Sequence, residues 1–226
     1  MGVGPDFAQD ELLSMSARQD RIFLFSKTPY PGVNHIPILR LDYLQVPIDF
    51  SSYDYIIATS KEVFSALDKL GNWKSLPVLA ISETTAGMAK EMNARVLDIG
   101  DGYGKSLVEI VKEKYGGLRA LYPHAKVVAF DIAEALKGCS VEIDSFIVYK
   151  TSCSQVELPE LPSDAICVFT SPSSVECFEK QYAFLPSYQI VCIGETTRCA
   201  LPEGVRSMVS ERTSVHSAIE CAKKLI

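Results

Sequence analysis

The sequence lacks the features that place a protein in a membrane or on nucleic acid. No apolar stretch approaches the roughly 18 residues that a membrane-spanning helix requires. The chain has 22 Lys and Arg against 28 Asp and Glu, a formal net charge of −6, and its basic residues are scattered. Because nucleic-acid binding depends on a clustered basic surface, we expect neither a nucleic-acid partner nor a membrane partner.

Residues for metal and thiol chemistry are also scarce or poorly spaced. The three histidines, His35, His124 and His216, are too far apart for a zinc pattern. The cysteines number seven, an odd count, and no pair has C-x-x-C spacing; Cys167 and Cys192 fall in apolar, strand-like runs. The pattern predicts reduced thiols packed as small apolar side chains in a cytoplasmic protein. We expect no metal site.

The first 20 residues lack the basic start and long apolar core of a secretory signal. We interpret residues 1–20 as an extension without a role in the chemistry.

The sequence does contain a repeat with an offset of 111 or 112 residues. Thr59-Ser60 after one apolar run corresponds to Thr170-Ser171 after another. The match continues through three pairs of segments: 54–67 with 165–178, 79–85 with 191–197, and 105–110 with 216–221. This repeat predicts two copies of one α/β unit.

Short β-branched runs alternate with helical patterns, which is typical of parallel α/β sheets. Asn93 and Gly204 lie 111 residues apart where a left-handed residue is expected to end a helix. The predicted strands are 22–25, 39–46, 55–58, 78–81, 95–98, 120–123, 145–150, 165–169, 189–193 and 205–208, and the predicted helices are 61–69, 84–92, 105–114, 127–136, 173–181, 196–201 and 214–225.

A glycine-rich segment at residues 100–106 follows a predicted strand and precedes a predicted helix, as a phosphate-binding loop does. Three residues separate Gly100 from Gly104, where the Walker pattern requires four. One residue separates Gly102 from Gly104, where the dinucleotide pattern requires two. We therefore predict a flexible loop at the rim of the site and no bound nucleotide.

The paired Thr-Ser strand ends, together with residues 148–151, 169–173 and 193–198, resemble uroporphyrinogen-III synthases over about residues 21–226. The resemblance implies an α/β fold of two flavodoxin-like parallel-sheet domains joined by a two-stranded β-ladder, with the active-site cleft between them. Residues 1–40 and 151–226 would form the first domain and 48–144 the second. Residues 40–47 and 145–151 would connect them.

The same resemblance implies a cofactor-free enzyme of porphyrin and heme biosynthesis. Its substrate would be hydroxymethylbilane, a linear tetrapyrrole with eight carboxylates, which closes with loss of water and inversion of ring D to give uroporphyrinogen III. It would be a cytoplasmic monomer, with a transient hand-off of substrate from hydroxymethylbilane synthase. The alternative is a non-catalytic two-lobed protein that binds a small anion. A receiver-type signalling domain is excluded because no acidic cluster follows the first strand.

An acidic protein can bind carboxylates through the free N–H groups and positive dipole at helix N-termini. In open α/β sheets these termini lie at the carboxyl edge, where ligands bind. The predicted substrate-binding residues are Thr59, Ser60, Ser82, Thr84, Thr85, Thr170, Ser171, Ser173, Gly194, Thr196 and Thr197. The alternative is that the hydroxyls only cap helices, for example Ser173 in a capping box with Glu176. Both roles can coexist.

Tyr149 is the predicted catalytic residue. Its phenol is protonated at neutral pH and can donate a hydrogen bond to a leaving hydroxyl. The alternative is a tyrosine that only packs on a neighbouring strand.

Overall fold

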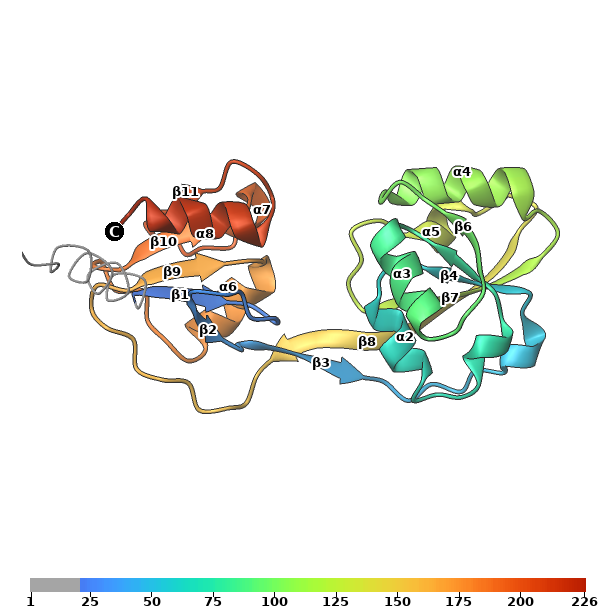
Figure 1. The fold of residues 1–226 in the computed structure, drawn as a ribbon, viewed down its shortest axis with the longest axis horizontal. Helices are drawn as coiled ribbons and strands as arrows, with labels where there is room; N and C mark the ends of the chain where they lie inside the picture. Colours follow the sequence, from blue (N-terminus) through green and yellow to red (C-terminus); the bar gives the residue numbers. More distant parts are fainter. Residues whose placement is uncertain (1–20) are drawn as a thin grey trace, which may run out of the picture. The chain divides into compact units, whose positions relative to one another are not determined.

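The computed structural model describes residues 21–226, which form two compact units (Figure 1). Unit 1 contains residues 21–40 and Ser152–Ile226, and unit 2 contains Leu41–Thr151. The chain passes between the units within two strands, β3 (Leu39–Tyr43) and β8 (Glu142–Cys153). The predicted extension at residues 1–20 lies outside the described residues.

Unit 1 has a parallel sheet in the order β11-β10-β9-β1-β2. The N-terminal strand β1 therefore pairs with β9, which comes from the C-terminal part of the chain. The strands are β1 (Ile22–Phe25), β2 (Asn34–Ile36), β9 (Ile166–Phe169), β10 (Gln189–Cys192) and β11 (Met208–Val209), and the helices are α6 (Pro172–Glu179), α7 (Glu195–Arg198) and α8 (Val215–Lys223).

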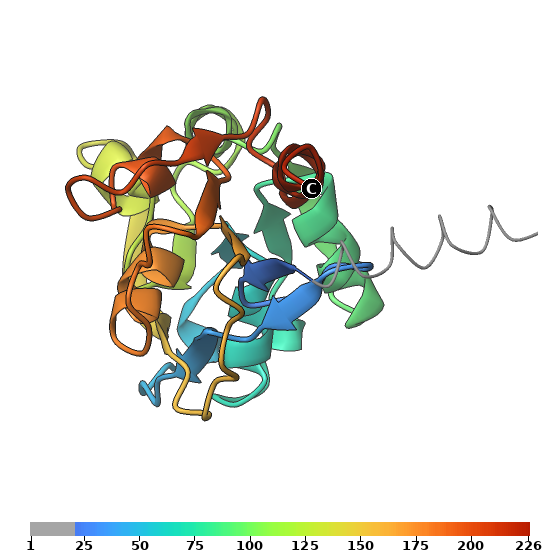
Figure 2. The same cartoon turned by 90° about the vertical axis from the view of Figure 1, so that its left-hand side faces the viewer.

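Strands β1 and β9 of unit 1 are buried at every residue, which is why they are uninterrupted apolar runs. Phe25, Phe169 and Phe178 pack on the α6 face, with ring centroids 5.0 to 5.2 Å apart. Leu24 and Ile219 belong to the cluster on the α8 face. Figure 2 looks toward unit 1, with the orange α6 and the dark red α8 on opposite sides of the sheet.

Unit 2 has a sheet in the order β3-β8-β7-β4-β5-β6, parallel from β8 to β6. Helices α2 and α3 contribute to the core on one face, and α4 and α5 to the core on the other. The further elements are β4 (Tyr55–Ala58), β5 (Val78–Ala80), β6 (Val96–Ile99), β7 (Arg119–Ala125), α2 (Glu62–Leu67), α3 (Glu83–Glu91), α4 (Gly104–Lys114), α5 (Ile132–Ala135) and the 3-10 turns η1 (Phe50–Ser52) and η2 (Trp73–Ser75).

The strand order confirms the prediction of two parallel-sheet units. The order β9, β10, β11 in unit 1 matches β4, β5, β6 in unit 2, while β1 and β2 take the places of β7 and β8. The backbone also confirms the two left-handed helix ends, since φ is 63° at Asn93 and 86° at Gly204.

Two local predictions are wrong. The helix expected over 127–136 reduces to α5, because the Asp131 carboxylate caps the chain there by accepting from Glu134 N at 3.1 Å. Strand β2 was not predicted, since its three residues include the polar Asn34 and His35.

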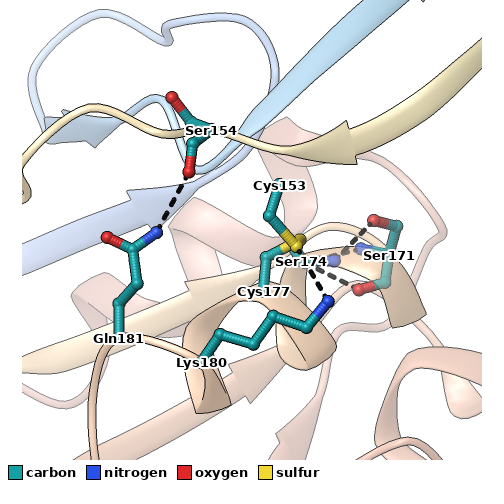
Figure 3. Close-up of a disulfide and its surroundings, with 7 residues drawn as sticks. All are labelled: Cys153, Ser154, Ser171, Ser174, Cys177, Lys180 and Gln181. Carbon is teal, nitrogen blue, oxygen red and sulfur yellow. Dashed lines mark hydrogen bonds between the residues drawn. A yellow bond between two sulfur atoms is a disulfide. The ribbon is translucent and has the colours of Figure 1, made fainter.

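The prediction that all cysteines are reduced is also wrong. Cys153, at the end of β8, forms a disulfide with Cys177 of α6 (Figure 3). The two cysteines are 24 residues apart in sequence, and the fold brings them together. Lys180 Nζ lies 3.5 Å from Cys153 Sγ, and Gln181 Nε2 donates to Ser154 O at 3.2 Å, so the end of β8 is fixed to α6. The other five cysteines are free thiols.

Candidate functional site

A cavity of about 340 Å³ opens at the carboxyl edge of the unit 2 sheet. The ends of five neighbouring strands contribute to it, from β6 at one side to β8 at the other. Ligands of open α/β sheets bind at this edge. The lining residues are Thr59, Ser60, Ile81, Gly102, Tyr103, Gly104, Ala125, Val127, Val128, Ala129, Phe130, Ile132 and Tyr149.

One wall of this cavity is the glycine-rich loop after β6. The loop expected to be flexible is held in place, because Gly100 N donates to Ala80 O and Gly102 N to Ile81 O, each at 2.8 Å. A Cβ at Gly100 would lie 2.9 Å from the Ile81 carbonyl oxygen, and one at Gly104 would lie 2.3 Å from the Phe130 ring. These two glycines therefore permit close packing of the cavity wall.

The rim of the cavity is apolar and exposed. The Tyr103 side chain is 74% exposed and Val127 is 85% exposed. Phe130 lies behind them against Gly104. Such a rim suits a ligand with flat, apolar faces.

Polar side-chain groups of the cavity lining converge around Tyr149. Burial raises the pKa of Tyr149, and the neighbouring Ser60 hydroxyl acts in the opposite direction. Ser60 Oγ also accepts a hydrogen bond from Glu62 N, the first residue of α2, at 3.2 Å, so the same hydroxyl lies at the start of α2 and beside the phenol. Because the pKa of a free tyrosine is already about 10, Tyr149 is neutral at physiological pH and can donate a proton or a hydrogen bond. The structure thus brings together Tyr149, Ser60 and Thr59.

The structure also places Tyr122 beside this group. It is fully buried in β7, and burial raises its pKa. Its ring stacks on His124 with centroids 4.7 Å apart. Sequence reasoning missed Tyr122, because a tyrosine in a buried strand has the same pattern as any core residue.

Two hydroxyls at the start of α3, those of Ser82 and Thr85, bond within the helix start. Ser82 Oγ accepts from Thr85 N at 3.4 Å, which confirms its capping role. Thr85 is buried, whereas Thr84 is exposed. None of the three lines the cavity, although the preceding Ile81 does.

The predicted residues of unit 1 lie at the equivalent edge, after β9 and β10. Thr170 Oγ1 donates to Phe25 O at 3.3 Å. The capping box lies between Ser171 and Ser174, so the prediction of a box between Ser173 and Glu176 is wrong.

After β10, Gly194 is the N-cap of the single-turn α7 and has no side-chain cap. Thr196 is exposed and Thr197 is buried. A cavity of about 380 Å³ in unit 1 lies instead where β10 begins, around Tyr188 and Arg206. It contains none of the predicted site residues.

Residues 29–220 match the family described as uroporphyrinogen-III synthase HemD. This chain belongs to the uroporphyrinogen-III synthase family. Uroporphyrinogen-III synthases cyclise hydroxymethylbilane, and this chain is therefore an enzyme with a tetrapyrrole substrate. No curated protein matches the chain in sequence.

Solved structures of uroporphyrinogen-III synthases share the fold. The Helicobacter pylori 26695 protein is 23% identical with a TM-score of 0.77, over 92% of this chain and 100% of that one. A mutant protein from the extremely thermophilic bacterium Thermus thermophilus is 17% identical with a TM-score of 0.52, over 91% of this chain and 98% of that one.

Within residues 21–226, no three His, Cys, Asp or Glu side chains gather as a metal site. No helix in the same range is long and apolar enough to cross a bilayer.

Proposed function

We propose that the unit 2 cavity holds the reacting end of hydroxymethylbilane while it loses water and closes with inversion of ring D. The observation that carries the proposal is the convergence of the Tyr149, Ser60 and Thr59 hydroxyls in a cavity whose other side chains, apart from that of Tyr103, are apolar. About 340 Å³ is near the lower end of small-ligand sites. The cavity therefore suits part of the tetrapyrrole rather than all four rings.

Loss of water from the hydroxymethyl group requires a hydrogen-bond or proton donor at the leaving oxygen. Tyr149 is protonated and lies beside the Ser60 hydroxyl, and general-acid assistance of this kind contributes about 10²- to 10⁴-fold. The apolar rim at Tyr103 and Val127 would contact the faces of the pyrrole rings. Holding the chain in the orientation that leads to inversion is catalysis by positioning.

Substrate carboxylates would bind at helix N-termini, because the free backbone N–H groups there donate hydrogen bonds to anions. In α3, the side chain of the N-cap Ser82 accepts a hydrogen bond from Thr85 N. The N–H groups of Glu83 and Thr84 are therefore left to bind a carboxylate. In α6, Pro172 has no N–H and Ser174 N is bonded to Ser171, so Ser173 N would be the donor.

The exposed hydroxyl of Thr196 and the backbone at Gly194 would add donors at the edge of unit 1, where Thr170 and Ser171 also lie. Thr85 and Thr197 are buried and would support the fold of this edge instead.

We extend the proposal to a cytoplasmic monomer that receives its substrate from hydroxymethylbilane synthase. The argument for the transfer is chemical: free hydroxymethylbilane closes without inversion, so a short transfer limits the formation of isomer I. The two units would be the two catalytic domains.

The proposal is tested by the isomer composition of the product. Hydroxymethylbilane is supplied, the product is oxidised, and porphyrin isomers I and III are separated. Wild type should give isomer III. Ala129→Trp, which narrows the unit 2 cavity, should shift the product toward isomer I, whereas Leu185→Trp in the unit 1 cavity should not. Isomer I alone from wild type, or equal effects of the two variants, would contradict the proposal.

A further inference from the structure

Two phenols of unit 2 are buried without a hydrogen-bond partner among the described residues: Tyr55 Oη and Tyr122 Oη. Both side chains are fully buried. Leaving a buried polar group unpaired costs about 1–3 kcal/mol. An unpaired phenol in a buried strand therefore requires an explanation, and the two phenols differ in what lies next to them.

The strand register places Tyr122 next to the cavity wall. Tyr55 pairs with Ala120 and Ile56 with Leu121, so Tyr122 lies alongside Ile57 in the parallel strands β4 and β7. Alternate residues of a strand share a face, and Ile57 and Tyr122 belong to the same core cluster. Thr59 follows two residues after Ile57 and lines the cavity.

The Tyr122 phenol lies close to Thr59. The Thr59 hydroxyl and the backbone of Ile132 partly oppose the rise that burial causes in the pKa of Tyr122, yet neither makes a hydrogen bond of good geometry. Both Thr59 and Ile132 line the cavity. The unpaired phenol is thus directly behind the cavity wall.

The ring of Tyr122 is held in this position. It stacks on His124 with an interplanar angle of 25°. His124 is itself fixed, because Nδ1 lies 2.7 Å from Ala125 O and Nε2 lies 2.7 Å from Ser145 Oγ. Any new partner for the phenol must therefore come to it.

We propose that Tyr122 is a positioning residue, whose phenol donates a hydrogen bond to Thr59 Oγ1 when substrate occupies the cavity. A hydroxyl can accept one hydrogen bond while donating another. With Tyr122 donating to its oxygen, Thr59 directs its own proton toward an oxygen of the bound tetrapyrrole. This inference rests on the proposed function of the cavity.

Tyr55 provides a matched control. It lies in the same unit and core cluster, but at the opposite end of β4, where its ring packs on Tyr115. At about 3.3 Å per residue, Tyr55 is roughly 13 Å from Thr59 along the strand. It has the same unpaired phenol and no access to the cavity lining.

The test compares Tyr122→Phe with Tyr55→Phe in kcat/KM for isomer III formation. Tyr122→Phe should lower kcat/KM roughly 3- to 10-fold, the net effect of one hydrogen bond, and Tyr55→Phe should leave it unchanged. In a Thr59→Val background, Tyr122→Phe should have no further effect, whereas in Thr59→Ser, which keeps the hydroxyl, its effect should persist. Neither Phe variant should lower the thermal unfolding temperature, since neither removes a hydrogen bond.

The outcomes separate two kinds of failure. Full activity in Thr59→Val would contradict the proposed function of the cavity together with the role of Tyr122. Reduced activity in Thr59→Val with full activity in Tyr122→Phe would overturn only the role of Tyr122. The same conclusion would follow if Tyr122→Phe reduced activity equally in the wild-type and Thr59→Val backgrounds.

Discussion

Thr59-Ser60 in unit 2 and Thr170-Ser171 in unit 1 follow equivalent strands, β4 and β9, of two sheets with the same strand order. In unit 1, Ser171 forms a reciprocal capping box and Thr170 donates to a strand carbonyl. In unit 2, Ser60 caps one backbone N–H and also faces the Tyr149 phenol. The repeat therefore sets the positions of the hydroxyls, while neighbouring side chains determine their chemistry.

The loops after the third strand of the repeat differ in the same way. In unit 1, Ser210 Oγ lies within hydrogen-bond distance of two carbonyl oxygens, Ile193 O at 3.0 Å and Arg212 O at 2.8 Å, so a hydroxyl holds that loop. In unit 2 glycines take this place, and their lack of a side chain lets Phe130 pack against Gly104. This close packing makes the loop a wall of the cavity. Its glycines only superficially resemble those of a phosphate-binding loop.

The disulfide gives the largest expected difference between the units. Replacing Cys153 and Cys177 together by Ala should lower the free energy of unfolding of unit 1 by roughly 3 kcal/mol, because the bond closes a loop across 24 residues. Unit 2 should be unaffected. Trp73 is the single tryptophan and reports on unit 2, while thiol labelling of the buried Cys167 reports on unit 1.

The control for this experiment is the thiol count of the unfolded wild type without reductant, expected to be the five free cysteines. Seven free thiols in the wild type would contradict the disulfide. Equal destabilisation of the two units in the double Ala variant would contradict an effect confined to unit 1.

Gly104→Ala tests the cavity wall of unit 2. The added Cβ would meet the Phe130 ring at 2.3 Å, so the ring must move. We expect a loss of about 1–2 kcal/mol of stability and lower kcat/KM. Gly87→Ala in α3 is the control, because a Cβ there meets nothing within 4 Å, and it should stabilise by about 0.5–1 kcal/mol. If Gly104→Ala also stabilised the protein, helix propensity would outweigh the packing of Phe130.

The sequence predicted the regular part of this architecture well. Strands β4 and β9 are apolar runs of four buried residues followed by Thr-Ser, and both features are visible without a structure. Asn93 and Gly204 marked helix ends correctly, since few other residues tolerate positive φ.

The predictions from sequence fail where contacts between distant parts of the chain determine the structure. The apolar run at residues 127–130 was predicted as the start of a helix but forms the wall and rim of the cavity. No local pattern pairs Cys153 with Cys177 or distinguishes Tyr122 from an ordinary core residue. Among the predicted site residues, the cavity lining includes Thr59, Ser60 and Tyr149; the others are at helix starts, where capping and ligand binding have the same sequence pattern.

Substituting the equivalent serines of the two units, Ser60 and Ser171, tests whether only the unit 2 hydroxyl takes part in the reaction. Ser171→Ala should cost about 1 kcal/mol of stability, the usual value for a lost N-cap. Ser60→Ala should cost a similar amount, about 1 kcal/mol, because it removes the hydroxyl that accepts from Glu62 N. Ser60→Ala should also lower kcat, because it removes the hydroxyl beside Tyr149. The comparison fails if kcat falls equally in the two variants at matched fractions of folded protein.

The smallest expected difference between the two units is the pH at which each begins to lose stability in alkaline solution. Burial raises the pKa of Cys167 to about 12 in unit 1, and burial raises the pKa of Tyr122 and Tyr149 in unit 2. Groups with raised folded pKa values stabilise fully below their unfolded pKa, and that stability is lost as pH rises through the folded pKa. Unit 1 should therefore weaken from about pH 8.5 and unit 2 from about pH 10, the unfolded values of Cys and Tyr.

The stability of each unit is measured by urea unfolding at a series of pH values. Thiol labelling monitors unit 1, and Trp73 fluorescence monitors unit 2. Loss of unit 2 stability at the lower pH would contradict this order.

The turnover of Tyr149→Phe tests the account most directly. This variant keeps the ring and removes the phenol that faces Ser60. We predict that kcat for isomer III formation falls about 100-fold or more, while the free energy of unfolding changes by only about 1 kcal/mol. A kcat equal to that of wild type would show that the hydroxyl cluster of unit 2 does not carry the reaction.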